Sequence, residues 1–185
     1  MRPLIVFTDV TVDGFMAGPE NDLGFMVDDP QLADELTGEL MAVADTMLWG
    51  RKSFTPSGAY WTAADGELAA WMNATPKVVL SSDSGFDVSS WANSTLAAGD
   101  GVDQVRRLKE TSGGSLVVFG GVQTVRSLVA ADLVDEYWLK VNPTIVGRGG
   151  SMFSAVGDRR TLTLRSARSF PSGTVALIYA PSRVS

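Results

Sequence analysis

The chain has 185 residues with 45% hydrophobic and 19% charged side chains, which favours one globular domain over residues 1–185. Its net charge of −6 argues against nucleic acid or an anionic membrane as a partner. The sequence contains no cysteine or histidine, which excludes disulfides, thiolate or imidazole metal sites and histidine catalysis. We therefore expect no metal. No apolar run suits a signal sequence or membrane span, so we expect a cytoplasmic protein.

The first half of the chain alternates between strand and helix patterns. Residues 3–12 are β-branched and apolar and end at the turn Asp13-Gly14, which predicts a buried strand. A helix is predicted over most of 29–48, because apolar residues recur there at helical spacing, namely Leu32, Leu36, Leu40, Val43 and Met47. A short strand over 46–50, a helix over 65–76 that Pro76 stops, and a strand over 77–82 follow.

The second half continues this alternation and then changes to consecutive strands. Helices are predicted over 101–114 and 122–133, with a strand over 115–121 between them. Residues 134–147 begin as a strand and end as a loop, and 160–170 with 173–181 form an antiparallel hairpin. This order predicts an α/β fold of three layers, with a central, mainly parallel sheet and an antiparallel C-terminal edge hairpin.

Three junctions that follow strands carry groups suited to anions, at residues 48–54, 78–85 and 117–125. We read each as a strand-to-helix turn, and in a parallel sheet all three lie at the carboxyl edge, where α/β folds bind ligands. Free N–H groups at a helix N-terminus suit a diphosphate. Each junction also has a plainer explanation: close packing for Gly120-Gly121, solvated cations for Arg51 and Lys52, a loop for Ser81-Ser82. Neither the Rossmann nor the Walker A fingerprint is present.

The order and spacing of several segments resemble the dihydrofolate-reductase-like family, specifically the reductase domain of bacterial riboflavin biosynthesis and its stand-alone relatives. These segments are VTVDGFMAGPEN, LWGRKSF, TPKVVLSS, WANSTLAAGD, the run from LVVFGG to GGSMF, and the closing hairpin. The resemblance implies a sheet flanked by helices and NADPH as cofactor. It assigns the cofactor to Ala17 and Gly18 beside the nicotinamide, Gly50, Arg51, Lys52 and Ser53 at the phosphates, Ser81 and Ser82 beside the adenosine, and Gly120, Gly121, Val122, Gln123 and Thr124 at the diphosphate.

The resemblance implies an NADPH-dependent reductase of a small heterocyclic substrate, pteridine-like or ribosylaminopyrimidine-like. Asp34 lies near the position of the acid that assists protonation in dihydrofolate reductases, although a solvated helix carboxylate explains it too. Asp9 and Asp13 are further candidates to face the substrate, although Asp13 also fits an Asp-Gly turn. Phe54 and Trp61 could form an apolar wall for the substrate or belong to the core. The zinc deaminase of the bifunctional enzymes needs cysteines that this chain lacks. The alternatives are an NADP-binding module without turnover and a scaffold without ligand.

We also expect a homodimer. Residues 134–147 are apolar on both faces of the predicted strand, with Tyr137, Trp138 and Val141 beside Leu139. The terminal hairpin adds a long edge that needs protection from strand pairing, and the resembling domains are commonly dimers. The alternative is a monomer in which helices cover the whole sheet.

Overall fold

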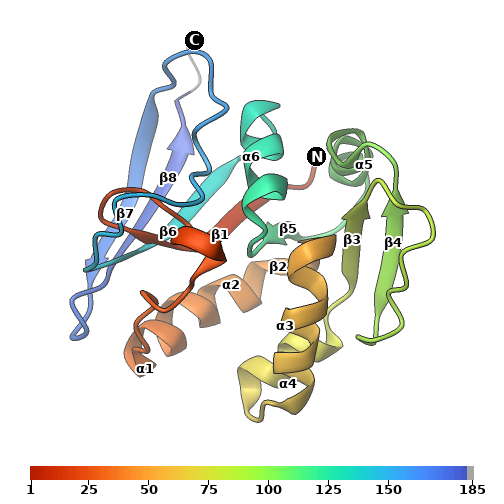
Figure 1. The fold of residues 1–185 in the computed structure, drawn as a ribbon, viewed down its shortest axis with the longest axis horizontal. Helices are drawn as coiled ribbons and strands as arrows, with labels where there is room; N and C mark the ends of the chain where they lie inside the picture. Colours follow the sequence, from red (N-terminus) through yellow and green to blue (C-terminus); the bar gives the residue numbers. More distant parts are fainter. Residues whose placement is uncertain (183–185) are drawn as a thin grey trace.

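A sheet of eight strands forms the middle of the molecule, in the order β4-β3-β2-β5-β1-β6-β8-β7 (Figure 1). The computed structural model describes residues 1–182, and the last three residues of the predicted domain, 183–185, lie outside the described residues. The strands from β4 to β6 in this order are parallel to one another, and β8 pairs antiparallel with both β6 and β7. The predicted fold class is therefore confirmed. The strands are β1 Leu4–Thr11, β2 Ala44–Gly50, β3 Lys77–Ser81, β4 Ser94–Ala98, β5 Ser115–Val118, β6 Glu136–Asn142, β7 Leu162–Ser169 and β8 Val175–Pro181.

Helices cover both faces of this sheet. They are α1 Pro30–Leu32, the π-helical η2 Ala33–Thr37, α2 Gly38–Val43, α3 Arg51–Ala63, α4 Glu67–Ala74, α5 Gly101–Glu110 and α6 Val122–Ala130, with a short 3-10 turn η1 Pro19–Asn21. One core cluster joins α1 to α4 with one face of the sheet, and a second joins α5 and α6 with the other. The central strands read as continuous apolar runs because both of their faces are covered. In residues 1–182 no helix is long and apolar enough to cross a membrane.

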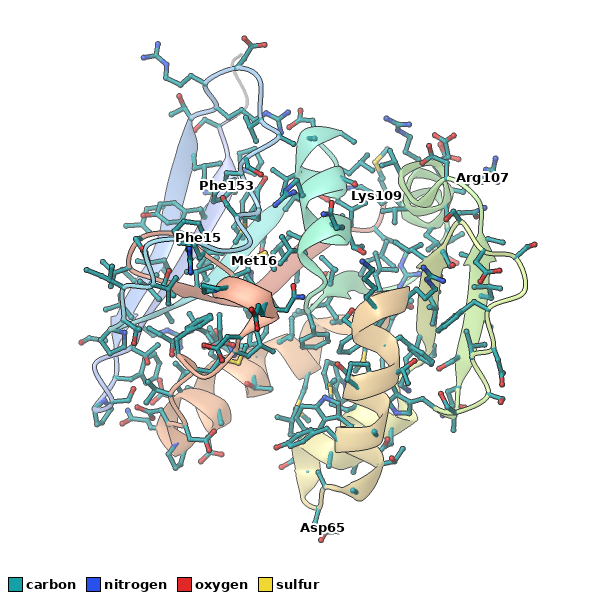
Figure 2. The ribbon with its side chains drawn as sticks, viewed as in Figure 1. Phe15, Met16, Asp65, Arg107, Lys109 and Phe153 are labelled. Atoms are coloured by element: carbon teal, nitrogen blue, oxygen red, sulfur yellow. The ribbon has the colours of Figure 1, made fainter. Side chains whose placement is uncertain are left out.

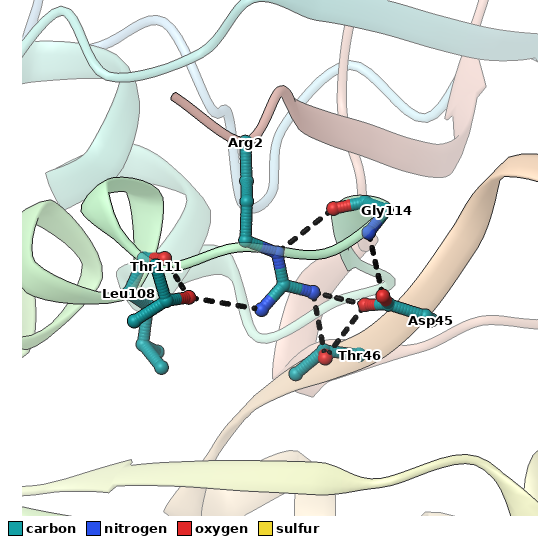
Figure 3. Close-up of polar contacts among 6 residues, drawn as sticks. All are labelled: Arg2, Asp45, Thr46, Leu108, Thr111 and Gly114. Atoms are coloured by element: carbon teal, nitrogen blue, oxygen red, sulfur yellow. Dashed lines mark hydrogen bonds and ion pairs between the residues drawn. The ribbon is translucent and has the colours of Figure 1, made fainter.

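A buried arginine holds the amino edge of the sheet together (Figure 3). The Arg2 side chain is 7% exposed and pairs with the carboxylate of Asp45. Its Nε donates to the carbonyl oxygen of Gly114 at 2.8 Å, and its Nη2 donates to Thr46 Oγ1 at 2.8 Å. These contacts join the chain before β1, the start of β2 and the turn before β5. A buried charge is tolerated when it is paired in this way, so the amino edge is structural.

The helix predicted over 29–48 ends earlier than its apolar spacing indicated. β2 begins at Ala44, so Met47 belongs to a strand, where it is fully buried between β3 and β5. Val43, placed on the apolar face by the same spacing, is 45% exposed. The pairing of β2 with β3 and β5 outweighs the local helical pattern, because it satisfies the backbone N–H and C=O groups on both edges of a buried strand.

The prediction that a helix follows the second junction is wrong. β3 ends at Ser81, and the chain then runs through a loop to β4, a strand that the sequence pattern did not indicate. β4 lies at the edge of the sheet and none of its residues is fully buried, so it lacks the apolar run of an internal strand. Because β4 pairs in parallel with β3, its end lies at the same edge as the three junctions.

Two features suggested a dimer, namely a strand that is apolar on both faces and the exposed edge of the terminal hairpin. In the structure only the second lies at an edge of the sheet. β6 is internal to the sheet, between β1 and β8, and Tyr137, Trp138 and Leu139 are buried within this chain. β7 is the outer strand, and its Leu164 is 51% exposed. Of these two features, only the outer strand β7 therefore still needs protection from strand pairing.

Candidate functional site

The first and third junctions meet at the carboxyl edge of the sheet, because β2 and β5 are neighbours. A Cβ atom on Gly50 would lie 2.2 Å from Thr124 Oγ1, so glycine is required there by lack of space. Gly121 has a φ of +82°, which favours glycine, and a Cβ on it would lie 3.1 Å from Ser53 Oγ. The starts of α3 and α6 are therefore packed closely against each other.

Both of these helices begin without a side-chain cap. Gly50 is the N-cap of α3 and Gly121 the N-cap of α6, and neither helix has a capping side-chain hydrogen bond. By contrast, α5 is capped by Asp100, whose Oδ1 accepts from Val102 N at 2.8 Å and Asp103 N at 3.3 Å. Uncapped N-terminal N–H groups and the partial positive charge of a helix start attract anions. Two such helix starts lie side by side here.

A cavity of about 420 Å³ adjoins the start of α6. Ser81 and Ser82 face it from the end of β3, and Gln123 and Thr124 face it from α6, so the second and third junctions also meet. Sequence reasoning missed the lining residues that follow β4 and two from α6, namely Gly99, Asp100, Gly101, Val102, Ser127 and Leu128. Recognising β4 as a parallel strand next to β3 would have placed the first four at this edge.

The two cations of the first junction lie outside the lining of that cavity. Arg51 Nη1 is 3.6 Å from Asp83 Oδ2, and both side chains are about half exposed. Asp83 follows the serine pair, and its N–H donates to Ser81 Oγ at 3.0 Å. Arg51 therefore reaches toward the turn after β3, while Lys52 is exposed to solvent.

The segment predicted to lie beside the nicotinamide is held next to α6 by a glycine loop. Met16 N donates to the carbonyl oxygen of Gly150 at 2.8 Å, and Gly150 N donates to that of Ala17 at 2.8 Å. A Cβ on Gly150 would lie 2.6 Å from Val122 Cγ2, so this loop separates Ala17 from α6 without room for a side chain. Figure 2 shows Phe15 and Met16 just beyond β1, with Met16 buried on the α6 side.

β1 and β5 separate before they reach the carboxyl edge. Their pairing ends at Val6 and Val118, whereas β1 continues beside β6 as far as Thr11 and Asn142. From Phe7 onward the β5 side of β1 has no strand partner, and its backbone groups can bond to a ligand amide. Across this separation the rings of Phe7 and Phe119 lie 5.8 Å apart, edge to face.

A polar group lies beside these rings, on the face covered by α1 to α4. Lys140 Nζ is 2.5 Å from Asp9 Oδ2 and 4.9 Å from the centre of the Phe7 ring. The fully buried Asn142 donates to Asp9 Oδ1 at 3.0 Å, and its Oδ1 accepts from Val27 N at 2.9 Å. The side chains of Asp9 and Lys140 are 13% and 18% exposed, so the pair is mostly shielded from water but accessible. Lys140 and Asn142 carried no role in the sequence analysis.

The other candidates for substrate contact or catalysis lie elsewhere. Asp34 is exposed on η2, while Leu36 of the same helix is fully buried. Phe54 is fully buried in the core against Phe86 and Trp91, so it contributes to core packing. Trp61 is partly buried at the margin of that core. None of these three positions supports a direct role in the chemistry.

Asp13 has a structural position in the turn after β1. Its carboxylate accepts from Thr11 Oγ1 at 2.6 Å and from Gly147 N at 2.7 Å. The hydrogen bond from the Thr11 hydroxyl is the main cause that lowers the pKa of Asp13, with smaller contributions from Gly147 and Val146. The carboxylate thus ties this turn to the loop after β6, as expected for an Asp-Gly turn.

Comparison with known proteins identifies the family and the fold of this chain. A family model described as the RibD C-terminal domain matches residues 2–176. The protein YyaP of Bacillus subtilis (strain 168), which is uncharacterized, is 28% identical over 184 residues, covering 96% of this chain and 94% of its own. Two solved structures share the fold. A putative riboflavin biosynthesis protein from Shewanella sp. PV-4 has a TM-score of 0.78 at 21% identity, covering 98% of this chain and 99% of its own.

The second structure is a dihydrofolate reductase from Enterococcus faecalis, determined with NADP(H) and RAB-propyl. It has a TM-score of 0.63 at 13% identity and covers 98% of this chain and 97% of its own. The resemblance recognised in the sequence is thereby confirmed. The chain belongs to the RibD C-terminal domain family, a family of NAD(P)H-dependent reductases with the dihydrofolate-reductase-like fold.

Proposed function

We propose that this chain is an NADPH-dependent reductase of a small heterocyclic substrate, pteridine-like or ribosylaminopyrimidine-like. The observation that carries the proposal is the meeting of two uncapped helix N-termini, α3 and α6, beside a cavity at the carboxyl edge of the sheet. Membership of a family of NAD(P)H-dependent reductases supports it.

The residues present fit a dinucleotide. A Cβ on Gly120 would meet no atom within 4 Å, so the bare backbone leaves room for a diphosphate to approach the start of α6. The cavity suits an adenosine, because Leu80 and Leu128 line it together with several hydroxyl groups. Arg51 and Lys52 are the cations available for a 2′-phosphate. The nicotinamide end would lie near Ala17 and Gly18, beside the unpaired edge of β1.

The residues around Phe7 would then hold the substrate. Bound NADPH would supply a hydride. Phe7 and Phe119 would pack against a flat ring, and Lys140 would donate hydrogen bonds to its polar edge. Asp9 pairs with Lys140, whose ammonium lies 4.9 Å from the centre of the Phe7 ring, so we assign proton delivery to a water that the Asp9 carboxylate orients beside the substrate. On this assignment Asp9→Asn lowers kcat strongly, whereas Asp34→Asn, at an exposed position, leaves it unchanged.

Calorimetry with NADPH and NADP⁺ tests cofactor binding, and NADPH oxidation across a panel of dihydropterins and ribosylaminopyrimidines tests turnover. Saturable binding with turnover of one member of the panel supports the proposal. Binding without any turnover supports the alternative of an NADP-binding module. Absence of binding to either dinucleotide refutes both.

The two cations give a second test of the same site. The Arg51→Ala/Lys52→Ala variant should weaken NADPH about tenfold more than NADH, since charge-assisted bonds contribute roughly 1.5–3 kcal/mol each and less at exposed positions. Equal losses for the two cofactors would contradict the assignment of Arg51 and Lys52 to the 2′-phosphate. Thermal unfolding of the variant serves as the control for folding.

A further inference from the structure

The cavity proposed for the adenosine carries a charge opposite to the one that a 2′-phosphate needs. This inference rests on the proposed function and concerns which dinucleotide the site selects. Asp100 is the one charged residue among the described residues that line the cavity. The remaining lining groups are hydroxyls, one amide, glycines and aliphatic side chains. A carboxylate at this place repels a phosphate and accepts a hydrogen bond from a ribose hydroxyl.

The position of Asp100 allows it both to repel a phosphate and to accept a hydrogen bond from a ribose hydroxyl. Its Oδ1 accepts the two N–H groups of Val102 and Asp103, and Oδ2 accepts no hydrogen bond from residues 1–182. Oδ2 is therefore a free acceptor. The same capping bonds satisfy N–H groups at the start of α5 and offset its partial positive charge. The 2′-phosphate of an adenosine bound in the cavity would thus face a carboxylate on this side, where an uncapped helix would have offered donors.

The cations outside the cavity are also partly neutralised. Arg51 is 3.6 Å from Asp83, so a phosphate must compete with that carboxylate for the guanidinium. Asp83 and Asp100 together oppose Arg51 and Lys52, and the four formal charges sum to zero. A site that selects NADPH strongly needs a net positive charge around the 2′ position.

We infer that Asp100 is a specificity-determining residue, which limits the preference for the 2′-phosphate so that NAD⁺ binds within about tenfold of NADP⁺. The scale is that of the Coulomb interaction between one carboxylate and a phosphate in a solvated, salt-screened site, which changes affinity about 3- to 10-fold. Asp83 acts in the same direction through Arg51.

The test is the affinity of the full chain for NADP⁺ and NAD⁺, measured by calorimetry, in wild type and in Asp100→Asn. Asparagine caps a helix as well as aspartate does, so the variant removes the charge and keeps the start of α5. We expect NADP⁺ to bind about 3- to 10-fold more tightly, with NAD⁺ unchanged or weaker, and the gain to shrink at high salt. The control is Asp103→Asn, which removes one charge from the same helix at an exposed residue that pairs with Arg106 and does not line the cavity.

The outcomes separate this inference from the proposed function. If neither dinucleotide binds wild type, the proposed function fails and the inference fails with it. If both bind and the ratio of their affinities is the same in wild type and Asp100→Asn, only the inference is overturned. An equal change of that ratio in the Asp103→Asn control also overturns it, because net charge would then explain the effect. A wild-type preference for NADP⁺ clearly above about tenfold overturns it too, since the opposing charges would then not limit the preference.

Discussion

Replacing Gly50 by alanine tests the close packing of the two helix starts. The new methyl group would lie 2.2 Å from Thr124 Oγ1, more than 1 Å closer than ordinary contact, and 3.3 Å from Thr124 Cβ. Rotation of the Thr124 side chain can move the hydroxyl away but leaves Cβ in place. We expect the free energy of unfolding to fall by about 1–3 kcal/mol, as for other overpacked sites. A shift of α6 should also weaken NADP⁺ binding, because the N–H groups of Gln123 and Thr124 would move.

A double-mutant cycle isolates the steric term. Thr124→Ala removes the atom at 2.2 Å, so Gly50→Ala should cost at least about 1 kcal/mol less in that background than in wild type. Any loss of helix-capping quality at residue 50 is the same in both backgrounds and cancels. Urea unfolding of the four proteins, followed by tryptophan fluorescence, measures the cycle. Additive effects of the two substitutions would show that the helix starts do not touch here.

Three further predictions concern other parts of the molecule. Gly120→Ala places its methyl group in open space, so it should leave thermal stability unchanged but weaken NADP⁺ about tenfold or more, whereas Gly38→Ala, also free of close atoms, should leave binding unchanged. Burial lowers the pKa of Lys77 from 10.5 to about 8, so between pH 8 and 10 the unfolded chain holds more protons and the free energy of unfolding should rise with pH. The full effect is about 3 kcal/mol and is absent in Lys77→Met; the same pH slope in both proteins would contradict it. Light scattering at micromolar concentration should give the mass of a homodimer, formed along the outer strand β7, and a mass near 19.6 kDa would rule it out.

Much of the fold was predictable because the relevant signals are local. The apolar run of residues 3–12 and the strand over 115–118 must be buried on both faces, and such runs alternating with helices give a parallel sheet. The same order places Gly50 and Gly121 at the carboxyl edge, because both follow strands of that sheet. The sequence therefore predicted where the candidate cofactor site lies.

The tertiary structure decided which side chains that edge brings together. Asp100 and Ser81 share a cavity because β4 pairs with β3, and Lys140 reaches Asp9 because β6 pairs with β1 in a register that makes these two residues neighbours. Strand pairing between distant segments depends on the total area that each arrangement buries, which no local pattern contains. For the same reason, only the packed molecule shows that neither Phe54 nor Asp34 lines the candidate site. Phe54 is buried in the core, and Asp34 is exposed to solvent.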